Sequence, residues 1–441
     1  MTKKTLHFAV DGSDSNPGTY KSPKRSPQSI NTLGLKPGDR VLFRQGDAFA
    51  PDPKVPLEAN TFVLVKTSGV TFDSYATGSE KAANPSFSHT GKKSVVWGFL
   101  GDDNVTRHLD IWNGETCIAN YQDHSGNQFE SLRIQNFGDG LVDKASNTTI
   151  RNCYFAHGWM VKDTGDASDY GARAIVLERY KGTPHTNTHI LECFIEECMA
   201  PSKAFGTDGA GVEFFGGVEL VLIEGCFVRR VKIMSEFGAV TSAKETLRNI
   251  TFSKNMITGP LAYFNPTTNA YYGDIDALRY QRNTVINDDE KKSPVFLSGA
   301  WGDLSKRLIF TNNLMTSPGV AFFNADAGTD LTTITRSGNV YSGAEVGMAL
   351  TNGESIQEIP FVNAQAGDYR LSCEMLMPDG TPYTPGAWGL ARDGEEGVYS
   401  VPSMKELMAL SGTSREGRRV YVGQAQMVYQ MTERGIWLKT S

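Results

Sequence analysis

A ladder of small residues recurs along the middle of the chain, and each member follows a similar short apolar strand. Its members are Cys153, Cys193, Cys226, Asn255, Asn283, Asn313 and Asn339. Neighbouring members are separated by 26 to 40 residues. Recurrence at such a period indicates one supersecondary unit that stacks repeatedly on itself. The ladder therefore predicts a solenoid rather than a set of compact domains.

The residues around the ladder have the pattern of short strands with one buried face. The position three before each ladder residue is apolar in the first six coils, and polar residues alternate with it. A second register is the dipeptide Gly-Ala, at Gly171-Ala172, Gly209-Ala210 and Gly238-Ala239, where it precedes a second strand. The two strand registers recur together from coil to coil. This pattern predicts an all-β fold, a parallel β-helix in which each coil hydrogen-bonds to the next.

The sequences on either side of the predicted solenoid differ in character from its repeats. Residues 1–50 are rich in turn residues around one short strand, which predicts an N-terminal cap on the first coil. We expect the β-helix to occupy residues 51–393. Residues 394–441 begin with a segment of helical character, VPSMKELMAL, and continue with three strand-like pieces. They predict a small C-terminal module.

Composition excludes several classes of partner. The net charge is −6 and like charges form no long run, so the chain has no surface suited to nucleic acid. It has no apolar stretch long enough to span a membrane, and we expect no signal peptide. Six cysteines are too few for a disulfide scaffold, and those on the ladder are expected to be buried thiols stacked in a turn. No cysteine and histidine cluster has zinc-ligand spacing, so we expect no metal site.

Several segments resemble the right-handed parallel β-helix proteins of the pectate-lyase-like superfamily. They are DGSDSNPGT, KPGDRVLF, SGVTFDSYATG, the ladder strands and the closing GDYRL, and the resemblance covers about residues 5–390. The C-terminal sequence is similar to short modules of bacteriophage tail and tailspike proteins. The resemblance implies a right-handed coil, a polysaccharide partner, and location in a virion tail or outside the cell after release. It also implies a homotrimer as one candidate assembly.

The Gly-Ala register places acidic residues just before three neighbouring strands. Asp169, Asp208 and Glu236 precede the three dipeptides, and no base alternates with them. Acids that lie one or two coils apart raise one another's pKa, which is how a glycosidase keeps one carboxyl protonated beside an ionised one. We predict that Asp208 and Glu236 are the catalytic pair. A solvated strand edge that deters aggregation explains the same acids equally well.

Four further residues are assigned around this pair. Glu213 lies on the strand that follows Asp208 and is expected to tune the pair together with Asp169. Arg173 is expected to face Gly211 across open space and to bind an anionic sugar, with Tyr170 beside it as a second substrate-binding residue. Each of these expectations depends on the Gly-Ala alignment.

The longest coil contains the insertion AHGWMVKDTGDASDY, which we expect to form a wall of the site. Trp159 in this loop is a candidate for stacking on a sugar ring, although an aromatic residue that packs the loop is as common. The loop also offers three candidate calcium ligands, Asp163, Asp166 and Asp169, but their spacing favours a solvated acidic loop. No other cofactor is expected.

We therefore predict an endo-acting depolymerase of a bacterial exopolysaccharide or capsular polysaccharide, a glycoside hydrolase with paired carboxylates. The first alternative is a polysaccharide lyase in which Lys244 or Arg173 removes the proton beside a uronate carboxyl. The second alternative is a non-catalytic phage tail or glycan-binding protein. Fold resemblance alone does not separate these classes.

Overall fold

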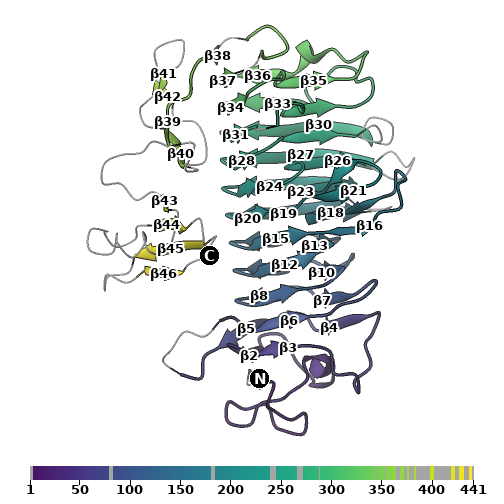
Figure 1. Cartoon of the computed structure of the whole chain (residues 1–441). Helices are drawn as coiled ribbons and strands as arrows, with labels where there is room; N and C mark the ends of the chain where they lie inside the picture. The colour runs from purple at the N-terminus through teal and green to yellow at the C-terminus, as the bar shows by residue number, and fades with distance from the viewer. Residues whose placement is uncertain are drawn as a thin grey trace.

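The computed structural model describes most of the chain up to residue 363 and short segments beyond it. The described ranges are 3–78, 83–179, 184–238, 245–265, 272–287, 289–343, 345–351, 353–363, 368–371, 375–376, 382–383, 398–401, 419–422, 427–431 and 437–439. Three long parallel sheets run through residues 5–356, and the coils stack on one another from the N-terminal end upward (Figure 1).

Sheets 1 and 2 have twelve strands each. Sheet 1 contains β1 (Thr5–Phe8), β2 (Arg40–Arg44), β5 (Thr71–Tyr75), β8 (Val105–Arg107), β11 (Gln128–Glu130), β14 (Thr149–Arg151), β19 (His185–Leu191), β24 (Val218–Glu224), β27 (Glu245–Ser253), β30 (Tyr272–Gln281), β33 (Leu308–Thr311) and β36 (Thr335–Ser337). Sheet 2 contains β3 (Ala48–Phe49), β6 (Ser86–Ser88), β9 (Asp110–Trp112), β12 (Arg133–Phe137), β15 (Tyr154–Gly158), β20 (Phe194–Glu196), β25 (Phe227–Arg229), β28 (Met256–Thr258), β31 (Thr284–Ile286), β34 (Leu314–Ser317), β37 (Val340–Gly343) and β38 (Ser355–Ile356).

Sheet 3 has ten strands and closes each coil. It contains β4 (Thr61–Val65), β7 (Val95–Phe99), β10 (Thr116–Asn120), β13 (Asp139–Asp143), β18 (Arg173–Arg179), β23 (Ala210–Gly216), β26 (Ser235–Gly238), β29 (Ala262–Phe264), β32 (Val295–Leu297) and β35 (Phe323–Ala325). Two hairpins project between sheets 2 and 3, namely β16 (Met160–Lys162) with β17 (Tyr170–Gly171), and β21 (Ala200–Ser202) with β22 (Gly206–Asp208). The predicted parallel β-helix is confirmed.

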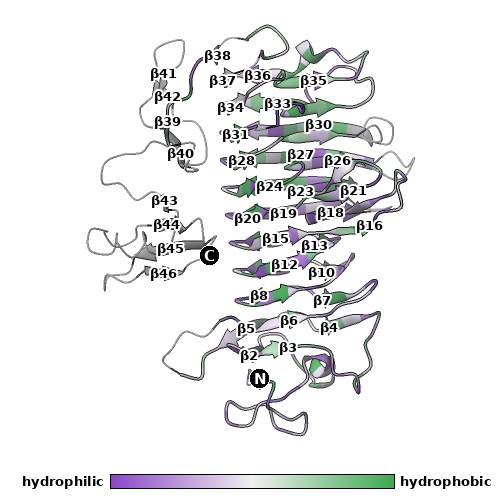
Figure 2. Ribbon diagram, viewed as in Figure 1, coloured by the Kyte–Doolittle hydropathy of each residue, from purple (hydrophilic) through white to green (hydrophobic). Residues whose placement is uncertain are grey.

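The interior of the coil holds one continuous hydrophobic core, because alternate residues of each strand point inward. Figure 2 shows the resulting mixture of hydrophobic and hydrophilic residues along the strands. Aromatic rings stack from coil to coil, as in Phe214, Phe237 and Phe264, whose centroids are 4.7 and 4.5 Å apart. This spacing matches the distance between neighbouring strands, so each coil continues the packing of the last.

The ladder lies in the turn between sheets 1 and 2, and its residues are buried. Asn283 Oδ1 accepts both the backbone N–H and the side-chain Nδ2 of Asn255 at 3.0 Å, and Asn313 accepts from Asn283 in the same way. Cys153, Cys193 and Cys226 are free and buried, as expected. Cys373 lies outside the described residues. The next coil thus supplies hydrogen-bond acceptors for the buried polar groups of each turn, which explains why the same turn repeats.

The alignment of the Gly-Ala dipeptides is wrong. Arg173 pairs with Ala210, which places Ala172 rather than Gly171 beside Gly209. Gly238 pairs with Phe215, inside the strand and not at its start. The dipeptide recurs because small residues suit crowded turns, whereas the strand register is set by which side chains are buried.

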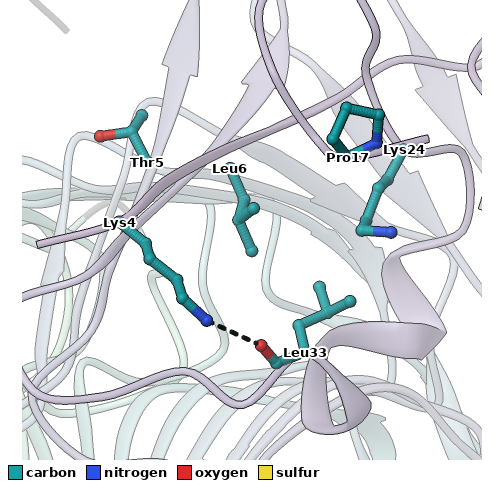
Figure 3. A pocket seen from close by; sticks show the side chains of 6 residues that line it. All are labelled: Lys4, Thr5, Leu6, Pro17, Lys24 and Leu33. Atoms are coloured by element: carbon teal, nitrogen blue, oxygen red, sulfur yellow. Dashed lines mark hydrogen bonds between the residues drawn. The ribbon is translucent and has the colours of Figure 1, made fainter.

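The first strands of sheets 1 and 2 lie near the N-terminus. Strands β1 to β3 already pair within sheets 1 and 2, so these sheets begin inside residues 1–50. A hollow at this end has Lys4 and Lys24 in its lining, and Lys4 Nζ donates to the Leu33 carbonyl at 3.4 Å (Figure 3). Lys24 Nζ donates to the Asn16 carbonyl at 2.7 Å. Both ammonium groups thus hold the end loops in place.

Four C-terminal strands form a sheet of their own. They are β43 (Val398–Val401), β44 (Arg419–Val422), β45 (Met427–Met431) and β46 (Trp437–Lys439). The helix expected over VPSMKELMAL falls almost wholly outside the described residues, and the domain boundaries stay a prediction. Among the helices that the structure describes, none is long and apolar enough to cross a membrane.

A polar network lies inside the core next to sheet 3. Asp143 and His185 are fully buried, with 3.6 Å between Asp143 Oδ2 and His185 Nε2. Asn120 Nδ2 donates to Asp143 Oδ1 at 2.8 Å, and His185 Nε2 lies 2.6 Å from Thr188 Oγ1. Burial raises the pKa of Asp143 to about 7 and lowers the pKa of His185 to about 3, with Arg179 adding to the latter shift. The pair is therefore neutral near pH 6.

This network predicts a pH dependence of stability that one substitution exposes. The pKa of Asp143 is 3.8 when unperturbed and about 7 in the folded protein. Asp143 therefore stabilises the folded state at low pH, and this contribution is lost as pH rises from 3.8 to about 7. His185 acts oppositely, since its contribution is lost as pH falls from 6.5 to about 3. The two slopes cancel in the native protein. Asp143→Asn removes one of the two slopes and leaves that of His185. In this variant we expect the free energy of unfolding, measured by urea titration, to rise by about 1.4 kcal/mol for each unit by which pH increases from about 3 to 6.5. Equal slopes in both proteins would contradict the assignment.

Candidate active site

Six charged residues gather on the outer face of sheet 3 and in the hairpin and turn beside it. This charged cluster consists of Asp139, Arg173, Asp208, Glu213, Lys232 and Glu236. Four carboxyl groups thus meet two cations. β13, β18, β23 and β26 supply four members from neighbouring coils, and hairpin β21–β22 supplies Asp208.

Strand register explains why two glutamates lie side by side. Val212 and Ser235 pair with each other and point into the core, so the next residues, Glu213 and Glu236, pair and point outward. Parallel neighbours of this kind have backbones about 4.8 Å apart. The outward column continues with Tyr263 on β29 and Phe296 on β32, whose ring centroids are 6.0 Å apart. Aromatic surface thus adjoins the carboxyl pair along the axis of the coil.

Arg173 binds two carboxylates at once. Its Nε and NH2 donate to Asp139 at 2.7 and 2.9 Å, and its NH1 donates to Glu213 Oε2 at 2.9 Å. The guanidinium also lies 4.7 Å from the ring centroid of Tyr170, and the Arg173 side chain is only 13% exposed. The open space expected beside Arg173 is therefore absent from this part of the structure, because Asp139 and Glu213 occupy its donors.

Lys232 joins the other two acids. Its Nζ donates to Asp208 Oδ1 at 2.8 Å and lies 4.0 Å from Glu236 Oε2. The ring of Phe205 lies 5.3 Å from the same nitrogen. The expectation that no base alternates with these acids is thus wrong, since Lys232 stands between Asp208 and Glu236.

Glu236 is the member of the charged cluster best placed to hold a proton. Its pKa is raised to about 7, chiefly by burial; the charge of Lys232 opposes this shift, and the charges of Glu213 and Asp208 contribute to it. Burial also raises the pKa of Glu213, but the direct Arg173 contact stabilises its charged form. The Glu236 side chain remains 17% exposed, so a ligand on the outer face can reach it. The pair therefore combines a carboxyl whose pKa is raised to about 7 with one that an arginine contacts directly.

Asp169 lies in the loop between β16 and β17, where its carboxylate holds the loop together. It accepts the backbone N–H of Thr164 at 2.7 Å and that of Gly165 at 2.8 Å, and these bonds help to lower its pKa. Asp166 binds Lys162 and Ser168, and Asp163 accepts the Lys203 backbone N–H at 2.7 Å. Each carboxylate of the loop thus has its own protein donors, and the preference for a solvated acidic loop over a calcium site stays a prediction.

The remaining predicted residues lie in different places. Tyr170 covers Arg173, and Trp159 lines a separate hollow outside the charged cluster. Lys244 lies outside the described residues.

Sequence analysis missed Asp139 and Lys232. Asp139 stands in a glycine-rich stretch that reads as an ordinary solenoid turn, and Lys232 lies outside a regular strand. A register taken from buried residues, with Leu141, Ile175 and Val212 in one inward column, places Asp139 beside Arg173 and thereby finds it. Within the described ranges, no three His, Cys, Asp or Glu side chains are grouped so that they could hold a metal ion.

Comparisons with known proteins support the architecture. No protein-family model matches the sequence, and neither does any curated protein. The solved structure of pectate lyase Pel9A aligns over 90% of this chain and 92% of its own, with 15% identity and a TM-score of 0.53. A rhamnogalacturonan lyase aligns over 86% and 94%, with 16% identity and a TM-score of 0.55. A tailspike mutant of an E. coli bacteriophage, in complex with a hexasaccharide, aligns over 73% and 56%, with 10% identity and a TM-score of 0.46.

Proposed function

We infer that the chain is a right-handed parallel β-helix of the pectate-lyase-like type. We propose that it is an endo-acting glycoside hydrolase that cleaves a bacterial exopolysaccharide or capsular polysaccharide. The observation that carries this proposal is the pairing of Glu236 with Glu213 on the outer face of sheet 3. An outer sheet face accepts the middle of a long glycan, which suits endo cleavage.

Glu236 is assigned the role of general acid. A glycosidase needs one carboxyl that is protonated near neutral pH and one that is ionised, and the raised pKa of Glu236 meets the first need. Glu213, bound to Arg173, meets the second, and Asp208 stands on the far side of Lys232. Glu213 thus replaces Asp208 as the first candidate for the charged partner. Its strand spacing from Glu236 is close to the carboxyl separation of about 5–5.5 Å in retaining enzymes, so we expect retained configuration.

The charged cluster is less suited to a lyase. Proton abstraction by Lys or Arg requires the neutral base, yet the pKa of Lys232 is raised by Glu236 and Asp208, and that of Arg173 by Asp139 and Glu213. The excess of carboxyl groups also repels a uronate. These charges favour a neutral or amino sugar at the cleavage point rather than the anionic sugar first assigned to Arg173.

A panel of purified bacterial polysaccharides tests the proposal. Hydrolysis releases reducing ends without new ultraviolet absorbance, whereas β-elimination produces an unsaturated sugar that absorbs. We expect the first result. Equal gains of reducing ends and absorbance would establish the lyase, and the absence of both with retained glycan binding would favour a binding protein.

The pH profile is a second expected result. Because the general acid must be protonated, kcat/KM should fall by about tenfold per pH unit as pH rises through about 7, the pKa of Glu236. Measurement of initial rates across pH 5–9 checks this, with protein stability monitored in parallel. A rate that stays constant through this range would remove Glu236 from the acid role.

We also propose that the protein acts in a phage tail or free outside the bacterial cell. The polysaccharide substrate and the tailspike-like C-terminal text support this location. Light scattering on the full chain would decide between a monomer and the homotrimer that such a location favours.

A further inference from the structure

A hollow of about 470 Å³ lies at the turn between sheets 2 and 3, at the base of the two hairpins. Its lining includes Asn136, His157, Trp159, Glu197, Met199 and Arg230. We call it the turn hollow. None of its lining residues belongs to the charged cluster, so it is a separate feature of the surface.

One wall of the turn hollow is polar and consists of stacked turn residues. His157 pairs with Glu197, and Arg230 NH2 lies 2.9 Å from Glu197 Oε1. The same NH2 also reaches the buried carboxylate of Glu196 at 2.9 Å, which Arg229 holds at 2.7 Å. These contacts fix the directions of the side chains while His157 and Arg230 keep about half of their surface exposed. The wall therefore presents oriented donors and acceptors to solvent.

Two other lining residues, Trp159 and Met199, are apolar. Trp159 and Met199 stand at the starts of the two hairpins, and Met199 is 44% exposed. Backbone bonds hold Trp159 on both sides, since its N–H donates to the Phe137 carbonyl at 2.8 Å and its carbonyl accepts from Ala172 at 2.8 Å. Asp163 and Lys203 link the hairpins above. The hollow is thus formed before any ligand arrives.

The residues of the polar wall share one backbone conformation. Asn136, His157, Glu197 and Arg230 have φ values between 51° and 64°, a left-handed conformation that is costly for residues with side chains. In the next coil the equivalent position is Gly259, which adopts positive φ without this cost. The same conformation recurs at turns of other coils, so it places these four side chains at equivalent positions of successive coils.

We propose that the turn hollow binds a pyranose ring of the polysaccharide, at a site distinct from the cleavage point. A pyranose has an apolar face that suits Trp159 and Met199 and a rim of hydroxyl groups that suits Asn136, Glu197 and Arg230. The charges of the Glu196, Glu197, Arg229 and Arg230 group balance, so a neutral sugar is the expected class. The site would hold the glycan while the charged cluster cleaves it, and in this respect it rests on the proposed function.

The test measures retention without cleavage. Fluorescently labelled full-length Glu236→Gln is applied to an array of bacterial capsular polysaccharides and exopolysaccharides, alone and combined with Trp159→Ala or Met199→Ala. We expect each added substitution to weaken binding by about tenfold on the same glycans. Trp112→Ala is the matched control, because Trp112 is an exposed tryptophan on β9, in sheet 2 outside the hollow. Thermal unfolding checks that each variant is folded.

Unchanged binding in folded Trp159→Ala and Met199→Ala variants would overturn the proposal, as would a Glu236→Gln chain that binds no glycan on the array. The proposed function is judged separately, by release of reducing ends with the wild-type protein. Loss of retention in the hollow variants with normal cleavage by Glu236→Gln would refute the catalytic assignment and leave the hollow.

Discussion

Replacement of Glu236 by Gln should lower the rate of glycan cleavage by about 10²–10⁴-fold, because glutamine has no proton to give to the leaving oxygen. The substitution keeps the shape and burial of the side chain, so the fold should be unaffected. Initial rates of reducing-end release measure the effect. The loss should be in kcat, since the interaction is made in the transition state.

Glu224→Gln is the matched control for this substitution. Glu224 lies on the outer face of sheet 1, where its side chain is 37% exposed and pairs with Lys254 at 3.1 Å. Its replacement should leave cleavage unchanged. If Glu236→Gln cleaves as fast as Glu224→Gln, Glu236 is not the acid. Comparison of Glu213→Gln with Asp208→Asn then identifies the charged partner, and we expect the larger loss for Glu213.

Replacement of Glu354 by Ala should lower the free energy of unfolding by about 3–5 kcal/mol, since it leaves a buried charge without its partner. Glu354 Oε2 lies 3.1 Å from Arg336 NH1, and their side chains are 0% and 2% exposed. Glu354 Oε1 also accepts from Asn339 Nδ2, the last member of the ladder, at 2.9 Å. The residue therefore completes the hydrogen bonds of the final coil. Urea unfolding measures the loss.

Two comparisons separate this effect from a general cost of losing a glutamate. Glu224→Gln, which breaks an exposed ion pair, should cost no more than about 1 kcal/mol. The double substitution Arg336→Met with Glu354→Leu should recover much of the stability, because it removes both buried charges. A Glu354→Ala protein as stable as Glu224→Gln would show that the pair contributes nothing to the end of the solenoid.

The architecture was predictable because its signal repeats. Seven ladder positions specify the same turn, and an error at one of them leaves the others intact. Burial of the ladder and the parallel pairing of the coils were confirmed. The turn also continues to Leu109 and Leu132, each preceded by a residue with positive φ, which residue type alone did not reveal.

The site was harder to predict because it depends on single residues and on exact register. The Gly-Ala alignment placed Glu236 with Asp169, whereas strand pairing puts it beside Glu213. A shift of one residue moves a side chain to the other face of a strand, so small alignment errors reassign every contact. Lys232 reaches Asp208 from a turn, where no periodic pattern exists to find it. Partners of this kind require coordinates.

The most direct test of the central claim is cleavage in water enriched in heavy oxygen, followed by mass spectrometry of the products. Hydrolysis adds one oxygen atom from solvent at each broken bond, and hydrolysis is the cleavage that we assign to Glu236 and Glu213. We expect one heavy oxygen per broken bond, at the new reducing end, in the wild-type products and a strongly reduced yield with Glu236→Gln. Products without heavy oxygen, which carry a double bond instead, would contradict the hydrolase and establish elimination.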